Sequence, residues 1–590
     1  MHCFIRTTIL ATLAVLSFAQ DQQPLLSGGH SRAKILTPKL DAAIDAILKE
    51  FNSPAGVGVA IVQKSFVSGE WTVETAGYGI AKIDGTKVTG DTLFSIGSNS
   101  KLFDIIATGL LISNESLTPR VSWNTKIASV LPDWGLMDPV ASSESTIVDV
   151  MSHRTGLPPH DLLPHEDVHE VIKNLRYLKP STGFRELYQY NNHMYTLLSA
   201  LPEVLVGIPF ETYVNDFILE PLGMTSTTYY SKLAKDSGHL ADGLGRDGVN
   251  QTQDPFGIGR VRPFPYWTPN DGIPGDANSG DAGVISNAKE MAIWLQALLS
   301  EGRHPTQNKT VIPAEVIRRV SSGVVVSQPV AEFPEDSPKV YGGGQSRGTY
   351  RGFEYIEHGG AVWGFRSAIT RIPNQNLGVA VLSNDNTFGT QIVKAVRFCI
   401  LDEALSLEAV NWTERLKSQI ISSIKDGIPT SRPTNPSPSF PINELAGIYR
   451  HPGYGTIELC DVSAIKPPSE SCRHLLSDIP ATLPDVLDPL VPTLVAKWRG
   501  VEVTHISLAH FEHNVFNATA FYSVPTGNSS DKPFWVNAMG PGFVAEFAFD
   551  EKFGFGVRGF WGAGVGVESP GGASVKDRAE AWFEKLDGSS

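Results

Sequence analysis

The sequence has little cysteine, no basic cluster and no long hydrophobic run beyond its first residues. Only four of its 590 residues are cysteine, and none form a Cys-x-x-Cys pair. This spacing excludes the common zinc-ribbon and thioredoxin-like motifs. A net charge of −14 without a basic cluster argues against a nucleic acid or an anionic membrane as the main partner. No stretch after the N-terminus is long enough to span a bilayer.

The bulk composition is typical of a large folded protein. Hydrophobic residues make up 41% of the chain and charged residues 19%, which fits a globular protein. Because 590 residues are too many for one hydrophobic core, we expect two or more domains. We find no internal repeat.

The N-terminus has the features of a secretory signal peptide, predicted over residues 1–19. Arg6 precedes an apolar run that begins at Ile9, and the small residues Ser17 and Ala19 suit a cleavage site. We therefore expect a secreted protein. Asn-x-Ser/Thr sequons fit a secreted glycoprotein, and the sequence has them at Asn114, Asn250, Asn308, Asn411, Asn517 and Asn528.

The cysteines fit an oxidising compartment. Cys3 would be removed with the signal peptide. Cys460 and Cys472 are close enough in sequence for a disulfide that closes a short loop. Cys399 is then left unpaired, and we expect it to be buried.

Hydrophobic periodicity predicts helices between two groups of strands. We predict a helix over 39–51 and strands over 56–63, 71–82, 364–371 and 377–382. A helical and loop region extends to Leu299. Strands from both ends of this region suggest one antiparallel sheet, within a first domain over 36–425.

A Pro- and Ser-rich segment, residues 426–441, has the composition of a semi-rigid linker. Beyond it, short alternating runs rich in Gly, Phe and Trp fill residues 442–590. This pattern predicts an all-β domain, either a sandwich or a barrel.

Ser98 and Lys101 form the first candidate catalytic pair. They stand where a helix is predicted to begin, and residues i and i+3 share one helix face, so the amine can reach the serine oxygen. The helix N-terminus supplies free N–H groups where an oxyanion would form. The spacing alone is common, because Ser-x-x-Lys also starts at Ser31, Ser286, Ser422, Ser463 and Ser529.

A tyrosine and an asparagine supply the second candidate element. Tyr190, beside a lysine amine, can act as a general base toward serine. Asn192 can hold the lysine and a substrate carbonyl. Tyr213 and Asn215 repeat the pattern, but they lie in a predicted helical run and are interpreted as structural.

The third element is His358-Gly359-Gly360, at the start of a predicted strand. Glycines let a substrate lie against the strand backbone, and a strand N–H can complete an oxyanion hole. His358 supplies a polar, potentially cationic group beside the serine. The similar His451-Pro452-Gly453 is interpreted as a turn.

In this order, the three elements resemble the serine β-lactamase and penicillin-binding-protein superfamily. The branch of this superfamily that the sequence resembles contains class C β-lactamases, D-Ala-D-Ala carboxypeptidases and related esterases. Its members carry Ser-x-x-Lys, Tyr-x-Asn and Lys/His-x-Gly. The resemblance covers Leu40 to Glu403 and includes the lesser stretches 151–158, 221–225 and 280–289. It implies an α+β fold, an α/β sandwich: an antiparallel sheet flanked by helices, with an all-helical subdomain. It also implies a C-terminal all-β domain of the lipocalin-like kind.

The resemblance also implies a role for each residue of the site. Ser98 would be the nucleophile, Lys101 and Tyr190 would share the base role, and Asn192 would orient Lys101 and the substrate. The oxyanion hole would be the N–H groups of Ser98 and Ala361, next to Gly359 and Gly360. No cofactor or metal is implied, and Ser286-x-x-Lys289, inside a family stretch, is explained as structural.

The resemblance implies that His358 stands where many relatives have a lysine that binds a substrate carboxylate. A β-lactam or D-Ala-D-Ala substrate is therefore less favoured, unless Arg366 supplies the missing positive charge. Trp363 could wall the acyl pocket or pack in the sheet. We expect a secreted serine hydrolase that acts through an acyl-enzyme on an ester or amide of a small molecule or peptide. An acyltransferase or thioesterase-like enzyme on a specialised metabolite is the alternative.

Two readings from other classes remain. His165, Glu166 and His169 match His-Glu-x-x-His, a zinc metallohydrolase motif, although no clear third ligand follows. The histidines would flank the buried stripe of an amphipathic surface helix. A non-catalytic binding protein is the other reading, and the presence of Ser98, Lys101 and Tyr190 together argues against it.

Overall fold

A computed structural model of the chain describes residues 34–164, 167–268, 273–307, 309–426, 438–526, 533–564 and 566–586. Several predictions fall outside these residues: the signal peptide, the serines at 31 and 529, sequons Asn308 and Asn528, His165 and Glu166, and residues 427–437 of the linker.

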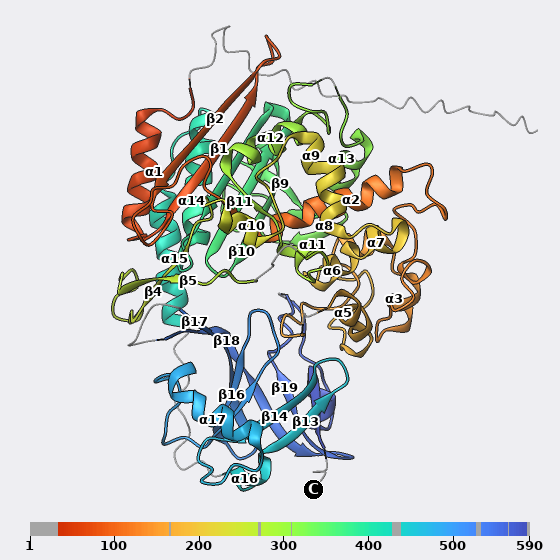
Figure 1. Cartoon of the computed structure of the whole chain (residues 1–590), viewed down its shortest axis with the longest axis vertical. Helices are drawn as coiled ribbons and strands as arrows, with labels where there is room; N and C mark the ends of the chain where they lie inside the picture. Colours follow the sequence, from red (N-terminus) through yellow and green to blue (C-terminus); the bar gives the residue numbers. More distant parts are fainter. Residues whose placement is uncertain are drawn as a thin grey trace, which may run out of the picture.

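The N-terminal part of the molecule is built on an eight-stranded antiparallel sheet (Figure 1). Its strand order is β2-β1-β12-β11-β10-β9-β8-β7. The bounds are β1 Gly56–Lys64, β2 Trp71–Gly79, β7 Val325–Gln328, β8 Lys339–Tyr341, β9 Ser346–Tyr350, β10 Phe353–Val362, β11 Phe365–Ile372 and β12 Leu377–Ser383. The two predicted groups of strands therefore meet, with Val57 of β1 opposite Ser383 of β12.

One predicted strand is shorter than expected. β2 ends at Gly79 rather than continuing to Lys82. Gly79 has φ of +73°, and a Cβ there would lie 2.4 Å from the carbonyl oxygen of Ala55. Only glycine fits this turn, and it ends the strand.

The sheet is covered on both faces because its central strands are apolar on both sides. In β1, Val59 and Ile61 enter one core, while Ala60 and Val62 enter the other. Alternation along a strand produces this division. The first core holds helices α1 Pro38–Glu50, α14 Gly389–Ala404 and α15 Trp412–Asp426; the second holds α2 Ser100–Ser113 and α12 Ala288–Leu299.

A mostly helical region lies beside the sheet and contains the chain between β2 and β7 (Figure 1). Its further helices are α3 Pro139–Glu144, α4 Ile147–Met151, α5 Val168–Asn174, α6 His193–Ser199, α7 Leu201–Val206, α8 Phe210–Val214, α9 Glu220–Leu222, α10 Ser231–Asp236, α11 Ser279–Ala282 and α13 Ala314–Ser321. Two small ribbons join it, β3 Phe94–Ser95 with β6 Ile285–Ser286, and β4 Gly243–Asp247 with β5 Arg260–Phe264.

The C-terminal part is a closed eight-stranded barrel. Its strands are β13 Gly447–His451, β14 Gly455–Asp461, β15 Thr493–Lys497, β16 His505–Glu512, β17 Val515–Pro525, β18 Phe534–Phe549, β19 Phe553–Arg558 and β20 Ala581–Lys585, and its helices are α16 Ile442–Leu445, α17 Glu470–Thr482 and α18 Val575–Arg578. Aromatic side chains fill the interior, where Phe555 and Phe583 stack with ring centroids 5.0 Å apart and Phe516 and Phe547 are buried. Of the predicted sandwich and barrel, the barrel is observed.

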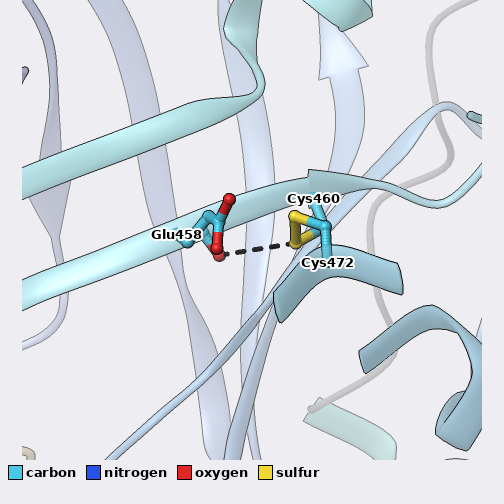
Figure 2. A group of neighbouring side chains, drawn as sticks. All are labelled: Glu458, Cys460 and Cys472. Carbon is cyan, nitrogen blue, oxygen red and sulfur yellow. Dashed lines mark hydrogen bonds between the residues drawn. A yellow bond between two sulfur atoms is a disulfide. The ribbon is translucent and has the colours of Figure 1, made fainter. Parts of the chain in front are cut away.

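The predicted disulfide is present in the barrel. Cys460 on β14 is bonded to Cys472 on α17, and its Sγ lies 3.8 Å from the carbonyl oxygen of Glu458 (Figure 2). Cys399, in α14, is a free thiol. It is partly rather than fully buried.

The barrel is packed against the first part of the chain through aromatic side chains. Trp363 stacks on Tyr522 of β17 with centroids 4.8 Å apart, and Phe264 of β5 stacks on Trp535 of β18 at 4.2 Å. Trp363 therefore lies at the contact between the two parts. The barrel strands β17 and β18 lie just below β5 in Figure 1.

Within the described residues, no single helix is long and apolar enough to span a membrane. One bent pair of helices, His193–Val206 with Phe210–Leu222, meets both criteria when taken together, with an angle of 82° between its halves.

Candidate active site

Ser98 lies in a short 3-10 turn, Gly97–Asn99, which directly precedes α2. Gly97 has φ of +53°, and a Cβ there would be 2.7 Å from the backbone nitrogen of Ala361 on β10. The side chain of Asn99 donates to the Ser367 hydroxyl at 2.8 Å, which ties the turn to β11. The turn is therefore fixed against the sheet.

The Ser98 hydroxyl is held between two groups that can exchange its proton. Lys101 Nζ lies 3.1 Å from Ser98 Oγ, and the Tyr190 hydroxyl donates to the same oxygen at 2.8 Å. The Lys101 side chain is fully buried. Its amine also donates to Asn192 Oδ1 at 2.7 Å and to the carbonyl oxygen of Asp281 at 2.9 Å. A serine in this position can lose its proton to an adjacent base as it attacks a carbonyl.

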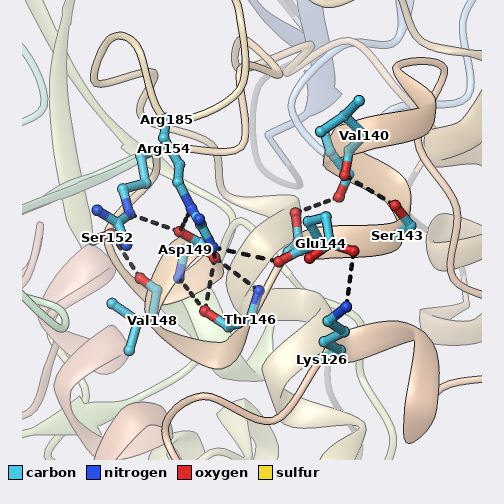
Figure 3. Close-up of polar contacts among 12 residues, drawn as sticks. Lys126, Val140, Ser143, Glu144, Thr146, Val148, Asp149, Ser152, Arg154 and Arg185 are labelled. Carbon is cyan, nitrogen blue, oxygen red and sulfur yellow. Dashed lines mark hydrogen bonds and ion pairs between the residues drawn. The ribbon is translucent and has the colours of Figure 1, made fainter.

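The segment that carries Tyr190 is fixed by a buried carboxylate, Asp149, and Figure 3 shows the contacts of Asp149 with Arg154 and Arg185. Asp149 forms a capping box with Thr146 at the start of α4. Arg154 donates to Asp149 at 2.7 Å, and Arg185 donates to both of its carboxylate oxygens at 2.8 Å. Burial opposes the charge, but the hydrogen bonds from Arg185 and Thr146 lower the pKa of Asp149. The ionised carboxylate thus anchors Arg185, five residues before Tyr190.

His153 is a buried residue that sequence reasoning did not single out. It lies within the noted stretch 151–158, and its ring packs 4.6 Å from the Tyr190 ring. Its Nδ1 accepts the backbone N–H of Asn191 at 3.1 Å. Burial, aided by the charge of Lys101, lowers its pKa well below the ordinary value. His153 is therefore a neutral support behind Tyr190.

His358 is neutral, which differs from the cationic role that its sequence position allowed. Its Nδ1 lies 2.6 Å from the Gly359 carbonyl oxygen, and its Nε2 lies 3.0 Å from the Tyr341 hydroxyl. The carbonyl only accepts, so the proton is assigned to Nδ1 and Nε2 accepts from Tyr341. Burial and the charge of Lys101 lower the pKa of His358 to about 4.

Arg366 does not offer a free cation either. Its guanidinium donates to the carbonyl oxygens of Val362, of Phe365 at 2.7 Å and of Asn386 at 3.3 Å. The guanidinium group therefore faces backbone carbonyl oxygens. The structure does not favour the suggestion that Arg366 replaces the carboxylate-binding lysine of the relatives.

The backbone of Gly360 and Ala361 lies directly against the serine turn. A Cβ on Gly360 would lie 1.8 Å from the carbonyl oxygen of Ile96. Only glycine allows this approach, which brings Ala361 on β10 beside the turn that holds Ser98. Two neighbouring backbone N–H groups are the arrangement that stabilises an oxyanion.

Two buried carboxylates behind Lys101 also escaped the sequence analysis. Asp104 is one helical turn after Lys101 and completely buried, and neither carboxylate oxygen has a hydrogen-bond partner among the residues that the structure describes. Burial and the nearby charge of Asp281 raise its pKa well above the ordinary value. Burial likewise raises the pKa of Asp281 to about 7, against the effect of Lys101. No motif marks Asp104, and although Asp281 lies in the noted stretch 280–289, its burial beside Lys101 could not be seen from the sequence.

Two residues that match the same motifs, Tyr213 and His451, have structural roles away from Ser98. Tyr213 in α8 is buried and packs on Phe217 at 4.5 Å. His451 ends β13, and its ring accepts the N–H groups of Gly453 and Tyr454 in the following turn. Both interpretations as structural residues agree with this placement.

Among the described residues, one group of His, Cys, Asp and Glu side chains is close enough for a metal: Glu458, Cys460 and Cys472. Its two sulfurs form the disulfide (Figure 2), so they are not thiolate ligands. His169 is exposed in the first turn of α5, whereas His165 and Glu166 lie outside the described residues.

Comparison with known proteins agrees with this geometry. The family model called Beta-lactamase matches residues 44–397. Relatives include the unguisins hydrolases of Aspergillus violaceofuscus, 29% identical over 68% of this chain and 73% of that protein, and of Aspergillus campestris, 30% identical over 64% and 71%.

A solved structure is similar in fold along most of the chain. It is the octameric penicillin-binding protein homologue from Pyrococcus abyssi, with a TM-score of 0.51 and 18% identity. The match covers 88% of this chain and 97% of that one. The chain described here belongs to the beta-lactamase family.

Proposed function

We propose that this protein is a secreted serine hydrolase that cleaves an ester or amide bond through an acyl-enzyme on Ser98. The Ser98 oxygen attacks the substrate carbonyl while its proton passes to the Tyr190–Lys101 pair. The N–H groups of Ser98 and Ala361 stabilise the oxyanion. The leaving group takes up the proton, and water then attacks the acyl-enzyme to release the acid and restore the serine.

One observation carries this proposal. Ser98 Oγ is within hydrogen-bond distance of both Lys101 Nζ (3.1 Å) and Tyr190 Oη (2.8 Å). A serine without a base is a weak nucleophile, and an adjacent base is the usual means of activating it.

The proposed substrate class follows from the charges around Ser98. His358 is neutral and Arg366 is engaged with backbone carbonyls. Neither offers the cation that would recognise a substrate carboxylate. This favours esters and amides that carry no carboxylate near the reacting carbonyl over β-lactams and acyl-D-Ala-D-Ala, which are amides that carry one.

Secretion is part of the same proposal and rests on the predicted signal peptide. The Cys460–Cys472 disulfide is typical of an oxidising compartment. The described sequon residues Asn114, Asn250, Asn411 and Asn517 are all exposed, as attachment of a glycan requires.

The acyl-enzyme can be tested with two substrates that share one acyl group. Phenyl acetate and p-nitrophenyl acetate should form the same acetyl-enzyme, so added methanol should divide it between methyl acetate and acetate in the same ratio for both. Ser98→Ala protein, which should form neither product, is the control. Different ratios for the two esters would contradict a common intermediate, and a large methyl acetate share would favour the acyltransferase alternative.

A further inference from the structure

A loop of the barrel reaches the side of the catalytic part that holds the Tyr190 segment. The loop joins β15 to β16. Trp498, at its start, donates its indole N–H to the carbonyl oxygen of Leu162 at 2.8 Å. Val503, near its end, is buried in the same core as the catalytic helices. The loop is therefore held against the catalytic part at Trp498, and at Val503 it is buried in a core that contains residues of both parts of the chain.

Between these anchors, Glu502 carries a carboxylate that is left unpaired. It has no hydrogen bond or ion pair to any residue in the described part of the chain. Burial, then the charges of Asp161 and Asp281, raise its pKa to about 7, while Arg366 acts in the opposite direction. The guanidinium of Arg366 is already engaged with carbonyl oxygens.

Asp161 connects this carboxylate to the catalytic groups. Asn192 donates to Asp161 Oδ1 at 3.2 Å and accepts from Lys101 at 2.7 Å. The Asp161 side chain is exposed to solvent, yet desolvation by surrounding protein raises its pKa. Leu162, which accepts the hydrogen bond from Trp498, directly follows Asp161 in the sequence. These contacts, with the chain from Asp161 through Asn192 to Lys101, hold the loop of Glu502 beside the Ser98 site, and we infer one cleft between the two parts of the chain.

A third carboxylate near this cleft is also without a partner on one oxygen. Asp281 is only 6% exposed, and its Oδ1 makes no hydrogen bond in the described structure. Asp161, Asp281 and Arg366 act on Glu502, and Glu502 acts in turn on the Tyr522 hydroxyl of β17. Lys101 lies beyond Asn192. Lys101 and Arg366 already donate their hydrogen bonds to acceptors within the protein. A cleft with unpaired carboxylates favours a positively charged ligand.

We propose that Glu502 of the barrel is a specificity-determining residue that binds a cationic group, such as an ammonium, on the substrate whose carbonyl reaches Ser98. This inference rests on the proposed function. It assigns the barrel a direct part in substrate selection, because Glu502 lies far from Ser98 in the sequence and reaches the cleft only through the docked loop.

Matched thioesters that differ only in charge test the proposal. Acetylthiocholine and S-(3,3-dimethylbutyl) thioacetate place a trimethylammonium or a tert-butyl group on the leaving side. The phenyl thioesters of 4-(trimethylammonio)butanoic and 5,5-dimethylhexanoic acid place the same groups on the acyl side. The readout is the ratio of kcat/KM for the charged and neutral member of each pair, which does not depend on the fraction of active protein.

In at least one pair, we expect the ratio to be about tenfold higher in the wild type than in Glu502→Gln, as for a partly desolvated charge pair. Glu502→Lys should lower it further. Glu470→Gln, which removes an exposed carboxylate on α17, should leave it unchanged. The wild-type ratio should also rise between about pH 6 and about pH 8, as Glu502 ionises. The rise should be smaller in Glu502→Gln, in which only Asp281 still ionises over this range.

Equal ratios in the wild type and Glu502→Gln for both pairs would overturn the proposal while leaving the hydrolase intact. Where a thioester is bound but not turned over, its protection of Ser98 against a fluorophosphonate gives the same comparison. Failure of a fluorophosphonate to label Ser98 would instead contradict the proposed function itself, and with it this inference.

Discussion

The chain contains two Ser-x-x-Lys segments that lie side by side in space but have different surroundings. Asn99 alone separates Ser98 from α2, and Asn287 alone separates Ser286 from α12. β3 pairs with β6 so that Phe94 lies opposite Ser286. Lys101 is completely buried, whereas the Lys289 side chain is 55% exposed.

The partners of the two segments explain the difference. Ser98 Oγ contacts Lys101 and Tyr190, whereas Ser286 Oγ contacts Thr227 Oγ1 at 2.7 Å. Lys289 forms an exposed ion pair with Asp91 at 2.7 Å. Spacing alone therefore does not make a nucleophile. A buried amine and a phenol supplied by a distant segment are also needed.

The largest expected difference concerns the two serines. Ser98→Ala should abolish turnover of an ester substrate, with a loss of at least about a thousandfold, while the protein remains folded. Ser286→Ala should keep its rate within about threefold and lose some thermal stability, because a buried hydrogen bond is removed. Steady-state rates and thermal unfolding check both. Comparable activity in the two variants would contradict the assignment of Ser98.

The next largest difference in rate should be between variants of the two lysines. Lys101→Ala removes the amine beside Ser98 and should reduce kcat/KM by at least about a hundredfold. Lys289→Ala removes only a surface ion pair, so the rate should change by less than about twofold. The measurement is kcat/KM for both variants, with circular dichroism to confirm folding. A near-normal rate in Lys101→Ala would mean that Tyr190 acts as base without it.

Two tyrosines allow a matched comparison. Tyr190→Phe removes the hydroxyl that contacts Ser98 and should lower kcat/KM by about a hundredfold. Tyr213→Phe, in the other Tyr-x-Asn segment, should leave the rate unchanged because this ring serves packing. If the two variants had equal rates, Tyr190 would have no part in proton transfer.

The smallest effect concerns the buried carboxyl groups behind Lys101. The folded protein raises the pKa of Asp104 above its ordinary value of 3.8, so the folded state holds this proton more tightly. Stability should therefore fall as pH rises above that value. Asp104→Asn keeps a neutral side chain and should reduce the loss of thermal stability between about pH 5 and about pH 8.

Thermal unfolding across this range measures the effect, and Asp91→Asn, which removes an exposed carboxylate, is the control. A loss of stability with pH that is identical in the wild type and Asp104→Asn would show that Asp104 ionises as readily in the folded protein as in the unfolded chain.

The sequence predicted four of the eight strands of the sheet, β1, β2, β11 and β12, because these are apolar runs between clear turns. It did not predict β7, β8 and β9, and His358, expected at the start of a strand, lies inside β10. It also named Ser98, Lys101, Tyr190 and Asn192, which the fold brings together. These residues carry local patterns whose order is recognisable.

The remaining features depend on distant contacts. Asp281 is 180 residues from Lys101, which donates to its carbonyl oxygen, and Glu502 lies in a barrel loop whose Trp498 contacts Leu162 of the catalytic part. Neutral His358 could not be predicted because its charge depends on burial and on Lys101. These properties appear only once the barrel, the sheet and the helical region are assembled.

The most direct test of the account is intact-mass and peptide analysis after treatment with a fluorophosphonate. We expect one adduct per chain, located on the peptide that contains Ser98, with none in Ser98→Ala and normal labelling in Ser286→Ala. An adduct on another residue, or equal labelling of Ser98→Ala, would contradict the central claim that Ser98 is the activated nucleophile.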